Sequence, residues 1–186
     1  MDASDAGIIV RAARLAVRAH GAQTRKVTGR AYVEHPARVA ARVLLRRDAD
    51  EAMVAAALLH DVVEDTAITL DEIRAEFGDA VADLVRDLTN VYKAGAHVGL
   101  NRAERKRLES ARLAGVSRSA KIIKMLDRID NLREAPGQDA GFLRVYAAES
   151  RDLVAAVGDA DAALREELLV EVARLETALA AAGGRA

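Results

Sequence analysis

Apolar side chains recur every three or four positions along most of this chain, which is the spacing of helices that bury one face. Near the start, Ile8, Ala12 and Leu15 follow this spacing, with Arg11 and Arg14 between them. The pattern predicts an all-α bundle with helices at about residues 6–20, 36–44, 50–61, 70–77, 80–89, 102–112, 120–132, 140–156 and 160–182.

Polar residues at the ends of these segments support the boundaries. Thr69 and Glu72 have the spacing of a capping box, in which the N-cap hydroxyl and the third side chain of the helix bond each other's backbone amides. Gly78 is expected to stop that helix, and Asp79 to cap the next one. Local sequence therefore predicts the middle helices closely.

Composition narrows the class of protein. The 186 residues are 51% hydrophobic and only 3% aromatic, as expected for one helical domain over residues 1–186. Its motif core would span about 8–155, with a covering helix at about 160–182. A net charge of −1 argues against nucleic acid as a partner, and no apolar segment is long enough for a membrane span. Without a signal peptide, a cytoplasmic protein is expected. The absence of cysteine leaves His, Asp and Glu as metal ligands.

The most informative stretch is the apolar run of residues 54–59, which leads directly into His60 and Asp61. Glu64 and Asp65 follow, with Glu64 on the same face as His60 if the helix persists that far. Charged groups beside a core are usually paired or bound to metal. Imidazole with carboxylate suits Zn, Mn or Fe. The alternative is an ordinary helix end with a capped histidine and solvated acids.

Two further residues have the chemistry of metal ligands. His35 precedes Pro36, which fits the first position of a helix, so His35 is expected at the N-cap. Asp127 lies within the apolar helix predicted at 120–132, where a carboxylate should be paired or ligated. Each also has a structural interpretation, because His35 could simply cap its helix and Asp127 could pair with Arg128 or Lys124.

Cations gather in two segments of this otherwise neutral chain. One is the loop around Arg25 and Lys26, and the other is the basic helix predicted at about 102–112. Arginine offers phosphate a planar fork and lysine a point charge. A polyphosphate ligand would use such groups, although charged runs are more commonly solvated faces.

The order His35, His60-Asp61, Asp127 resembles that of the HD metal-dependent phosphohydrolase superfamily. The surrounding residues resemble the hydrolase domain of the Rel/Spo alarmone enzymes, and most of all their stand-alone members, the small alarmone hydrolases. The motifs that carry this likeness are Gln23-Thr24-Arg25-Lys26, Tyr32-Val33-Glu34-His35-Pro36, Ala56-Ala57-Leu58-Leu59-His60-Asp61-Val62-Val63-Glu64-Asp65-Thr66, Glu104-Arg105-Lys106-Arg107-Leu108 and Lys124-Met125-Leu126-Asp127-Arg128-Ile129-Asp130-Asn131-Leu132-Arg133.

The resemblance implies an HD-type bundle and a role for each matched residue. One Mn²⁺ would be held by His35, His60, Asp61 and Asp127. The acidic pair Glu64 and Asp65 would orient or deprotonate the attacking water. Substrate contacts would come from Arg25, Lys26, Thr28, Arg105, Lys106, Asn131 and Tyr146.

The implied reaction is hydrolysis of the 3′-pyrophosphate of guanosine tetra- or pentaphosphate to pyrophosphate and GDP or GTP. Asp130 and Glu134 depart from the family pattern at positions that the resemblance places near the nucleoside, so the identity of the substrate's base is not determined. Alternatives are another HD phosphohydrolase, acting on an adenosine alarmone, a 5′-nucleotide or NADPH, and an inactive HD domain that senses nucleotides. The sequence does not determine the metal or the oligomeric state, and a homodimer is one option.

Overall fold

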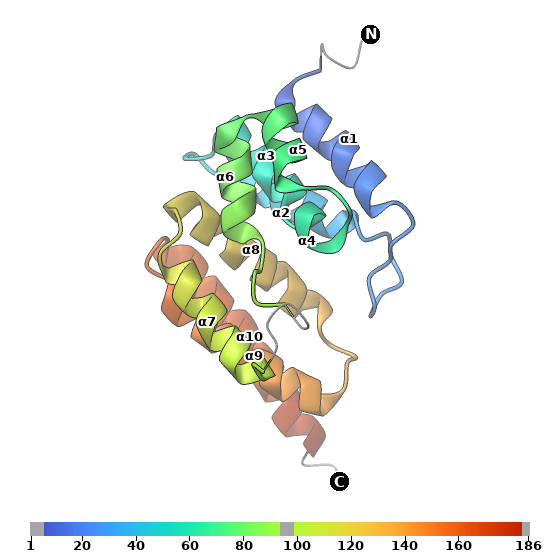
Figure 1. Cartoon of the computed structure of the whole chain (residues 1–186). Coiled ribbons are helices and arrows are strands. Elements are labelled where there is room, and N and C mark those ends of the chain that lie inside the picture. Colours follow the sequence, from blue (N-terminus) through green and yellow to red (C-terminus); the bar gives the residue numbers. More distant parts are fainter. Residues whose placement is uncertain (1–5, 94–98, 184–186) are drawn as a thin grey trace. The chain divides into compact units, whose positions relative to one another are not determined.

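The computed structural model describes residues 6–93 and 99–183, and the regular elements among them are helices (Figure 1). The predicted all-α class is confirmed. The described part of the chain has β pairing in one isolated antiparallel bridge, between Thr24 and Ala31. None of the described helices is both long and apolar enough to cross a bilayer.

The helices form two compact units, residues 1–90 and residues 91–186. In the first unit, α3 contacts α1, α2 and α6 and is buried from Met53 to Leu59. This helix is apolar on all sides, as expected for a helix surrounded by others. Among its described residues this unit contains α1 (Ile8–His20), α2 (Glu34–Leu44), α3 (Glu51–Leu59), α4 (Val62–Asp65), α5 (Leu70–Phe77) and α6 (Asp79–Leu88).

The second unit contains α7 (Arg102–Ala114), α8 (Arg118–Glu134), α9 (Ala140–Val157) and α10 (Ala162–Gly183). α9 packs against α7, α8 and α10, and α10 also packs against α8. The apolar face of α8 is buried as predicted, with Ile123 and Ile129 fully inaccessible to solvent. A single domain over residues 1–186 stays a prediction.

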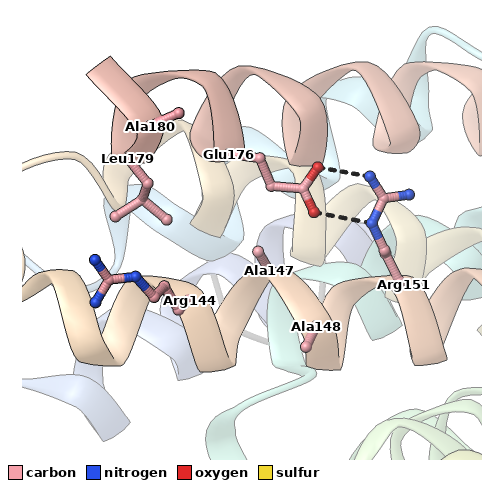
Figure 2. Close-up of a pocket in the computed structure, with 7 residues that line it drawn as sticks. All are labelled: Arg144, Ala147, Ala148, Arg151, Glu176, Leu179 and Ala180. Atoms are coloured by element: carbon pink, nitrogen blue, oxygen red, sulfur yellow. Dashed lines mark hydrogen bonds and ion pairs between the residues drawn. The ribbon is translucent and has the colours of Figure 1, made fainter. Parts of the chain in front are cut away.

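Charged pairs accompany the apolar contacts of α10. Figure 2 shows Arg151 of α9 donating to both carboxylate oxygens of Glu176 on α10, at 2.9 and 2.6 Å, beside a pocket between the two helices. Exposed ion pairs contribute little to stability, because water and salt screen their charges. Full burial of a side chain such as Leu168 or Val172 contributes about 1.5–3 kcal/mol. Apolar packing is therefore the main force that holds α10 in this unit.

The observed helix ends can be compared with the capping residues that the sequence predicts. Thr69 and Glu72 form the predicted capping box, with each side chain bonded to the backbone amide of the other residue. The prediction that Asp79 is an N-cap is wrong. Gly78 occupies that position, and Asp79 is the first residue of α6. Gly78 has a φ of 82°, a left-handed conformation that glycine adopts without steric cost.

Candidate metal centre and acidic pair

His60 and Asp61 form a turn between α3 and α4. The buried end of α3 carries His60 into the core, where its side chain is 1% exposed. The predicted helix at 50–61 ends at Leu59, and a separate helix begins at Val62. The helix does not persist from His60 to Glu64, so these residues do not share one helical face.

His35 approaches His60 from the neighbouring helix. It lies in the first turn of α2 and is fully buried. The prediction that His35 is the N-cap is wrong, because Val33 is the N-cap. Pro36 becomes the third helical residue, where its missing amide proton leaves no helical bond unmade. The rings of His35 and His60 meet edge to face, with centroids 5.1 Å apart.

Three potential ligand atoms converge in this unit. One ring nitrogen of His35 and one of His60 lie within 4.8 Å of each other. Oδ2 of Asp61 is 3.7 Å from Nε2 of His35 and 3.2 Å from Nε2 of His60. The Asp61 side chain is only 16% exposed, so its carboxylate faces the two imidazoles in a site largely shielded from water.

The tautomer of His60 bears on whether these residues fit a metal. Nδ1 of His60 lies 2.8 Å from the carbonyl oxygen of Ala57. A carbonyl only accepts hydrogen bonds, so Nδ1 carries the proton, and Nε2 of the neutral ring is an acceptor. This acceptor faces the carboxylate of Asp61, and a cation between two such groups is stabilising. The donor set fits a divalent metal of the Zn, Mn or Fe type.

The acidic pair lies at the end of α4, and each member is held differently. Oε2 of Glu64 accepts a hydrogen bond from the backbone amide of Asn90 at 3.0 Å. Oδ2 of Asp65 accepts one from the hydroxyl of Tyr32, also at 3.0 Å. Glu64 is half-buried and Asp65 is exposed. Both carboxylates are therefore anchored and can still be reached by water.

Tyr32 connects this acidic pair to the candidate ligands. Its hydroxyl also donates to Oδ2 of Asp61 at 2.7 Å. Burial, followed by the negative charge of Asp61, raises the pKa of Tyr32 far above its usual value, so the phenol keeps its proton. The ring of Tyr32 packs on that of His20, with centroids 4.6 Å apart. His20 ends α1 and is itself buried.

The segment between α1 and α2 folds back on itself as a hairpin of residues 23–32. The amide of Tyr32 donates to the carbonyl of Gln23 at 2.9 Å, which closes the base of the hairpin. Nearer the tip, the amide of Gly29 donates to the carbonyl of Arg25 at 2.9 Å. Gly29 has a φ of 69°, which glycine tolerates in such a turn.

This hairpin carries three of the predicted substrate contacts. The guanidinium of Arg25 lies over the ring of Tyr32, 5.5 Å from its centroid. Lys26 and Thr28 are exposed. The hydroxyl of Thr28 accepts a bond from the amide of Arg30 at 3.4 Å. Arg25 thus contacts the residue whose hydroxyl bonds Asp65.

Asp127 lies on α8 in the second unit and is 5% exposed. Its carboxylate accepts a hydrogen bond from the side-chain amide of Asn131, one turn later, and contacts Nζ of Lys124 at 2.9 Å. The pairing with Lys124 that the sequence left open is therefore present. A carboxylate has about four acceptor positions, so these contacts still allow Asp127 to bind a metal.

Cations and an aromatic ring gather on neighbouring helices of the second unit. Arg128 of α8 lies over the ring of Tyr146 on α9, 4.5 Å from its centroid, and donates to the hydroxyl of Ser150 at 3.0 Å. Lys106 of α7 is half-buried. Burial, and after it the positive charge of Arg128, lowers the pKa of Lys106. Lys106 also lines a groove of about 720 Å³ between α7 and α9, a volume typical of small-molecule sites.

Arg105 differs from its neighbour Lys106. Its Nη1 donates to the carbonyl of Leu100 at 2.6 Å, which links the guanidinium to the chain just before α7. That bond is made to the backbone of the same unit. We therefore expect a smaller share of substrate binding for Arg105 than for Lys106.

Sequence reasoning gave no role to the side chains of Tyr32 and Gln23 and considered Arg128 only as a possible partner of Asp127, although all three lie within the quoted motifs. A hydroxyl three residues before His35 was the available signal for Tyr32, because ligating carboxylates usually accept an outer hydrogen bond. Arg128 follows Asp127 in an apolar helix, where a second charge needs a partner. The sequence around Tyr32 or Arg128 does not show which residue each one contacts, because those contacts are made with residues far away in the sequence.

The fold has known counterparts among solved structures. The structure of a metazoan orthologue of SpoT, which hydrolyses ppGpp and plays a role in starvation responses, superposes with a TM-score of 0.79 at 30% identity. That match covers 91% of this chain and 96% of the other. A Listeria monocytogenes protein superposes with a TM-score of 0.62 at 29% identity, covering 79% and 96%.

Sequence relatives agree with this likeness. The guanosine-3′,5′-bis(diphosphate) 3′-pyrophosphohydrolase MESH1 of Homo sapiens is 40% identical over 134 residues, covering 70% of this chain and 71% of its own length. The Danio rerio MESH1 is 31% identical over 176 residues, covering 90% of this chain and 94% of its own.

The model of the HD domain family matches residues 12–175, which include parts of both units. The chain therefore belongs to the HD domain family. Within that family it is homologous to the MESH1 hydrolases named above.

Proposed function

We propose that this chain is a metal-dependent hydrolase that removes the 3′-pyrophosphate from guanosine tetra- or pentaphosphate. The observation that carries the proposal is the convergence of His35, His60 and Asp61 beside the anchored acids Glu64 and Asp65. Relatives named for this reaction support it, because the human and zebrafish proteins align over most of their own length.

The proposed metal ligands are His35, His60, Asp61 and Asp127, with one Mn²⁺ per chain. A divalent cation at such a site supplies Lewis acidity and lowers the pKa of a bound water. The assignment of Asp127 is supported by its burial on α8 and by a family model that spans both units. The hydrogen bond from His60 to the carbonyl of Ala57 keeps the ring in the tautomer that a ligand needs.

Glu64 and Asp65 are the groups proposed to hold the attacking water and take its proton. The water oxygen forms a bond to the phosphorus that is attached to the 3′ oxygen, and the bond between that phosphorus and the 3′ oxygen breaks. The 3′ oxygen leaves with the bonding electrons and takes up the proton released by the water, so the nucleotide keeps its 5′ phosphates with a free 3′ hydroxyl. The attacked phosphorus is released as part of pyrophosphate. The amide of Asn90 and the hydroxyl of Tyr32 would keep the two acids in place during this transfer.

Substrate phosphates would be held by cationic side chains from both units. Arg25 and Lys26 supply them from the hairpin, and Lys106 supplies one from the second unit. Asn131 and Tyr146 are proposed to contact the nucleoside, Tyr146 with a ring that already packs against Arg128. Thr28 and Arg105 are assigned smaller contributions, because Thr28 is a neutral exposed hydroxyl and Arg105 bonds the backbone.

The deciding experiment is a substrate panel with the purified chain and Mn²⁺. Guanosine tetra- and pentaphosphate, their adenosine counterparts and NADPH would each be incubated and the products separated by anion-exchange chromatography. The proposal expects pyrophosphate with GDP or GTP. Turnover of the adenosine alarmone or of NADPH alone would assign another HD phosphohydrolase. Absence of turnover with every substrate, combined with nucleotide binding, would favour a sensing domain.

Base preference is the least constrained part of the proposal. The resemblance assigns Asp130 and Glu134 to positions near the nucleoside, where both depart from the family pattern. Asp130 is 8% exposed, so a change there alters a buried environment on α8. Comparing kcat/KM for guanosine and adenosine alarmones in the wild type and in Asp130→Asn measures this directly. A preference that does not change in the variant would remove Asp130 from base selection.

A further inference from the structure

We infer that Tyr32 is a positioning residue whose hydroxyl sets the spacing between Asp61 and Asp65, an inference that rests on the function proposed above. The phenol oxygen lies 2.7 Å from Oδ2 of Asp61 and 3.0 Å from Oδ2 of Asp65. One group thereby contacts both the proposed metal ligand and one of the acids proposed to act on water.

Electrostatics explains why such a link is needed. Two carboxylates that approach the same point repel each other, and Asp65 is exposed and would otherwise turn toward water. A hydroxyl placed between the two carboxylates donates to both of them. A hydrogen bond to a charged acceptor is stronger than one between neutral groups. Because the phenol has a single proton, the two oxygens must stay close together to share it. The spacing of the two carboxylates is thus set by Tyr32.

The phenol is itself fixed in place on several sides. Its ring packs on that of His20 and also contacts the guanidinium of Arg25. Its amide bonds the carbonyl of Gln23, and the side chain of Gln23 donates to the backbone carbonyl of Asp65 at 3.1 Å. The base of the hairpin therefore holds Asp65 twice, once through its side chain and once through its backbone.

These contacts predict different effects for two nearly isosteric variants. Tyr32→Phe keeps the ring and loses the hydroxyl, so it should weaken Mn²⁺ binding through Asp61 and lower kcat at saturating Mn²⁺ through Asp65, each by about tenfold or more. Gln23→Met loses the side-chain bonds to the backbone carbonyl of Asp65 and to Nδ1 of His20, and it keeps the hydroxyl of Tyr32. It should lower kcat. Its Mn²⁺ affinity should stay within about twofold of the wild-type value, because the hydrogen bond from Tyr32 to Asp61 is kept.

Mn²⁺ affinity would be measured by calorimetric titration without substrate. The values of kcat and KM would be measured in separate assays at saturating Mn²⁺. Thr177→Val is the matched control, since it removes a hydroxyl that bonds the backbone of α10. Circular dichroism would establish that each variant is folded. Mn²⁺ affinity and kcat of Tyr32→Phe both within about twofold of wild type would overturn the inference, because loss of an outer-shell contact typically costs about 10–100-fold. If Tyr32→Phe does not fold, equal losses of affinity and kcat in Gln23→Met would also overturn it.

The inference and the proposed function can fail separately. If the wild type binds Mn²⁺ and leaves every alarmone intact, the proposed reaction is wrong, and the titration of Tyr32→Phe still decides the link to Asp61. If the wild type hydrolyses the alarmone and Tyr32→Phe matches it in both measurements, only the role of Tyr32 is wrong.

Discussion

Nε2 of His60 lies 3.2 Å from Oδ2 of Asp61, and both atoms are acceptors when the ring is neutral. Consecutive residues of a continuous helix point about 100° apart, so their side chains rarely meet. Here the helix ends at Leu59 and the turn lets the two groups face each other. The candidate metal centre therefore lies at the junction of α3 and α4.

Removal of His60 should abolish metal binding. Mn²⁺ at 100 times its Kd should stabilise the wild type by about 2.7 kcal/mol and raise its Tm, whereas His60→Ala should show no shift. Elemental analysis and thermal unfolding with and without Mn²⁺ provide the measurement. Normal metal content in His60→Ala would remove this residue from the ligand set.

Neutralising either member of the acidic pair should lower turnover without removing metal. Loss of a positioned general base typically costs about 10²–10⁴ in rate. We expect Glu64→Gln and Asp65→Asn to show such a drop in kcat at normal metal content. Asp71→Asn is the matched control, because its side chain is 97% exposed at the start of α5. Near wild-type turnover in both site variants would contradict the assignment.

Arg25→Ala should raise KM by about tenfold or more, because a charge-assisted hydrogen bond contributes about 1.5–3 kcal/mol. Arg105→Ala should have a smaller effect that fades at high salt, since salt screens the charge of a partly exposed guanidinium. KM would be measured against ionic strength, with Arg14→Ala on the exposed side of α1 as the control. A KM for Arg25→Ala equal to that of the control would exclude the hairpin from substrate binding.

Lys106 should make substrate capture sensitive to alkaline pH. Its pKa is lowered by burial and by Arg128, with Lys124 and Arg102 acting in the same direction and Glu149 opposing them. The ammonium is charged below this lowered pKa and becomes neutral as pH rises through it. The value of kcat/KM for an anionic substrate should therefore fall at a lower pH than an ordinary lysine would cause.

The variant Lys106→Arg tests this dependence, because arginine stays charged over the whole range. Its kcat/KM should lack the alkaline decline that the wild type shows, whereas Lys106→Met should be low at every pH. Profiles between about pH 7 and 11 would be compared at saturating Mn²⁺, a window that includes the usual lysine pKa of about 10.4 near its upper end. Identical profiles for the wild type and Lys106→Arg would show that Lys106 does not bind the substrate phosphates.

Much of the helical architecture could be read from the sequence, because helix formation depends on neighbouring residues. The capping box of Thr69 and Glu72 needs only three residues of separation, and the structure contains it. The apolar run of residues 54–59 predicted a buried helix for the same reason, and the structure buries all six. Errors occurred where two local signals competed, as at Gly78 and Asp79, where the left-handed glycine took the cap position.

The candidate site was predictable as a set of residue types and unpredictable as a geometry. The apolar stretch before His60 indicated a buried imidazole, and burial of His60 and His35 agrees with that reasoning. The end of α3 at Leu59 and the position of His35 in the first turn of α2 were not predicted. Both depend on how α2 packs against α3, which no short window of sequence describes.

By itself, the sequence determined the all-α class, the helix periodicity and the residues able to bind a metal, because each follows from side-chain chemistry and short spacings. The tertiary structure alone decided that one hydroxyl, on Tyr32, bonds both Asp61 and Asp65. These residues are 29 and 33 positions away from it in the chain. Such a contact depends on the closed hairpin and on the packing of α1 and α2 against α3, and periodicity carries no information about either.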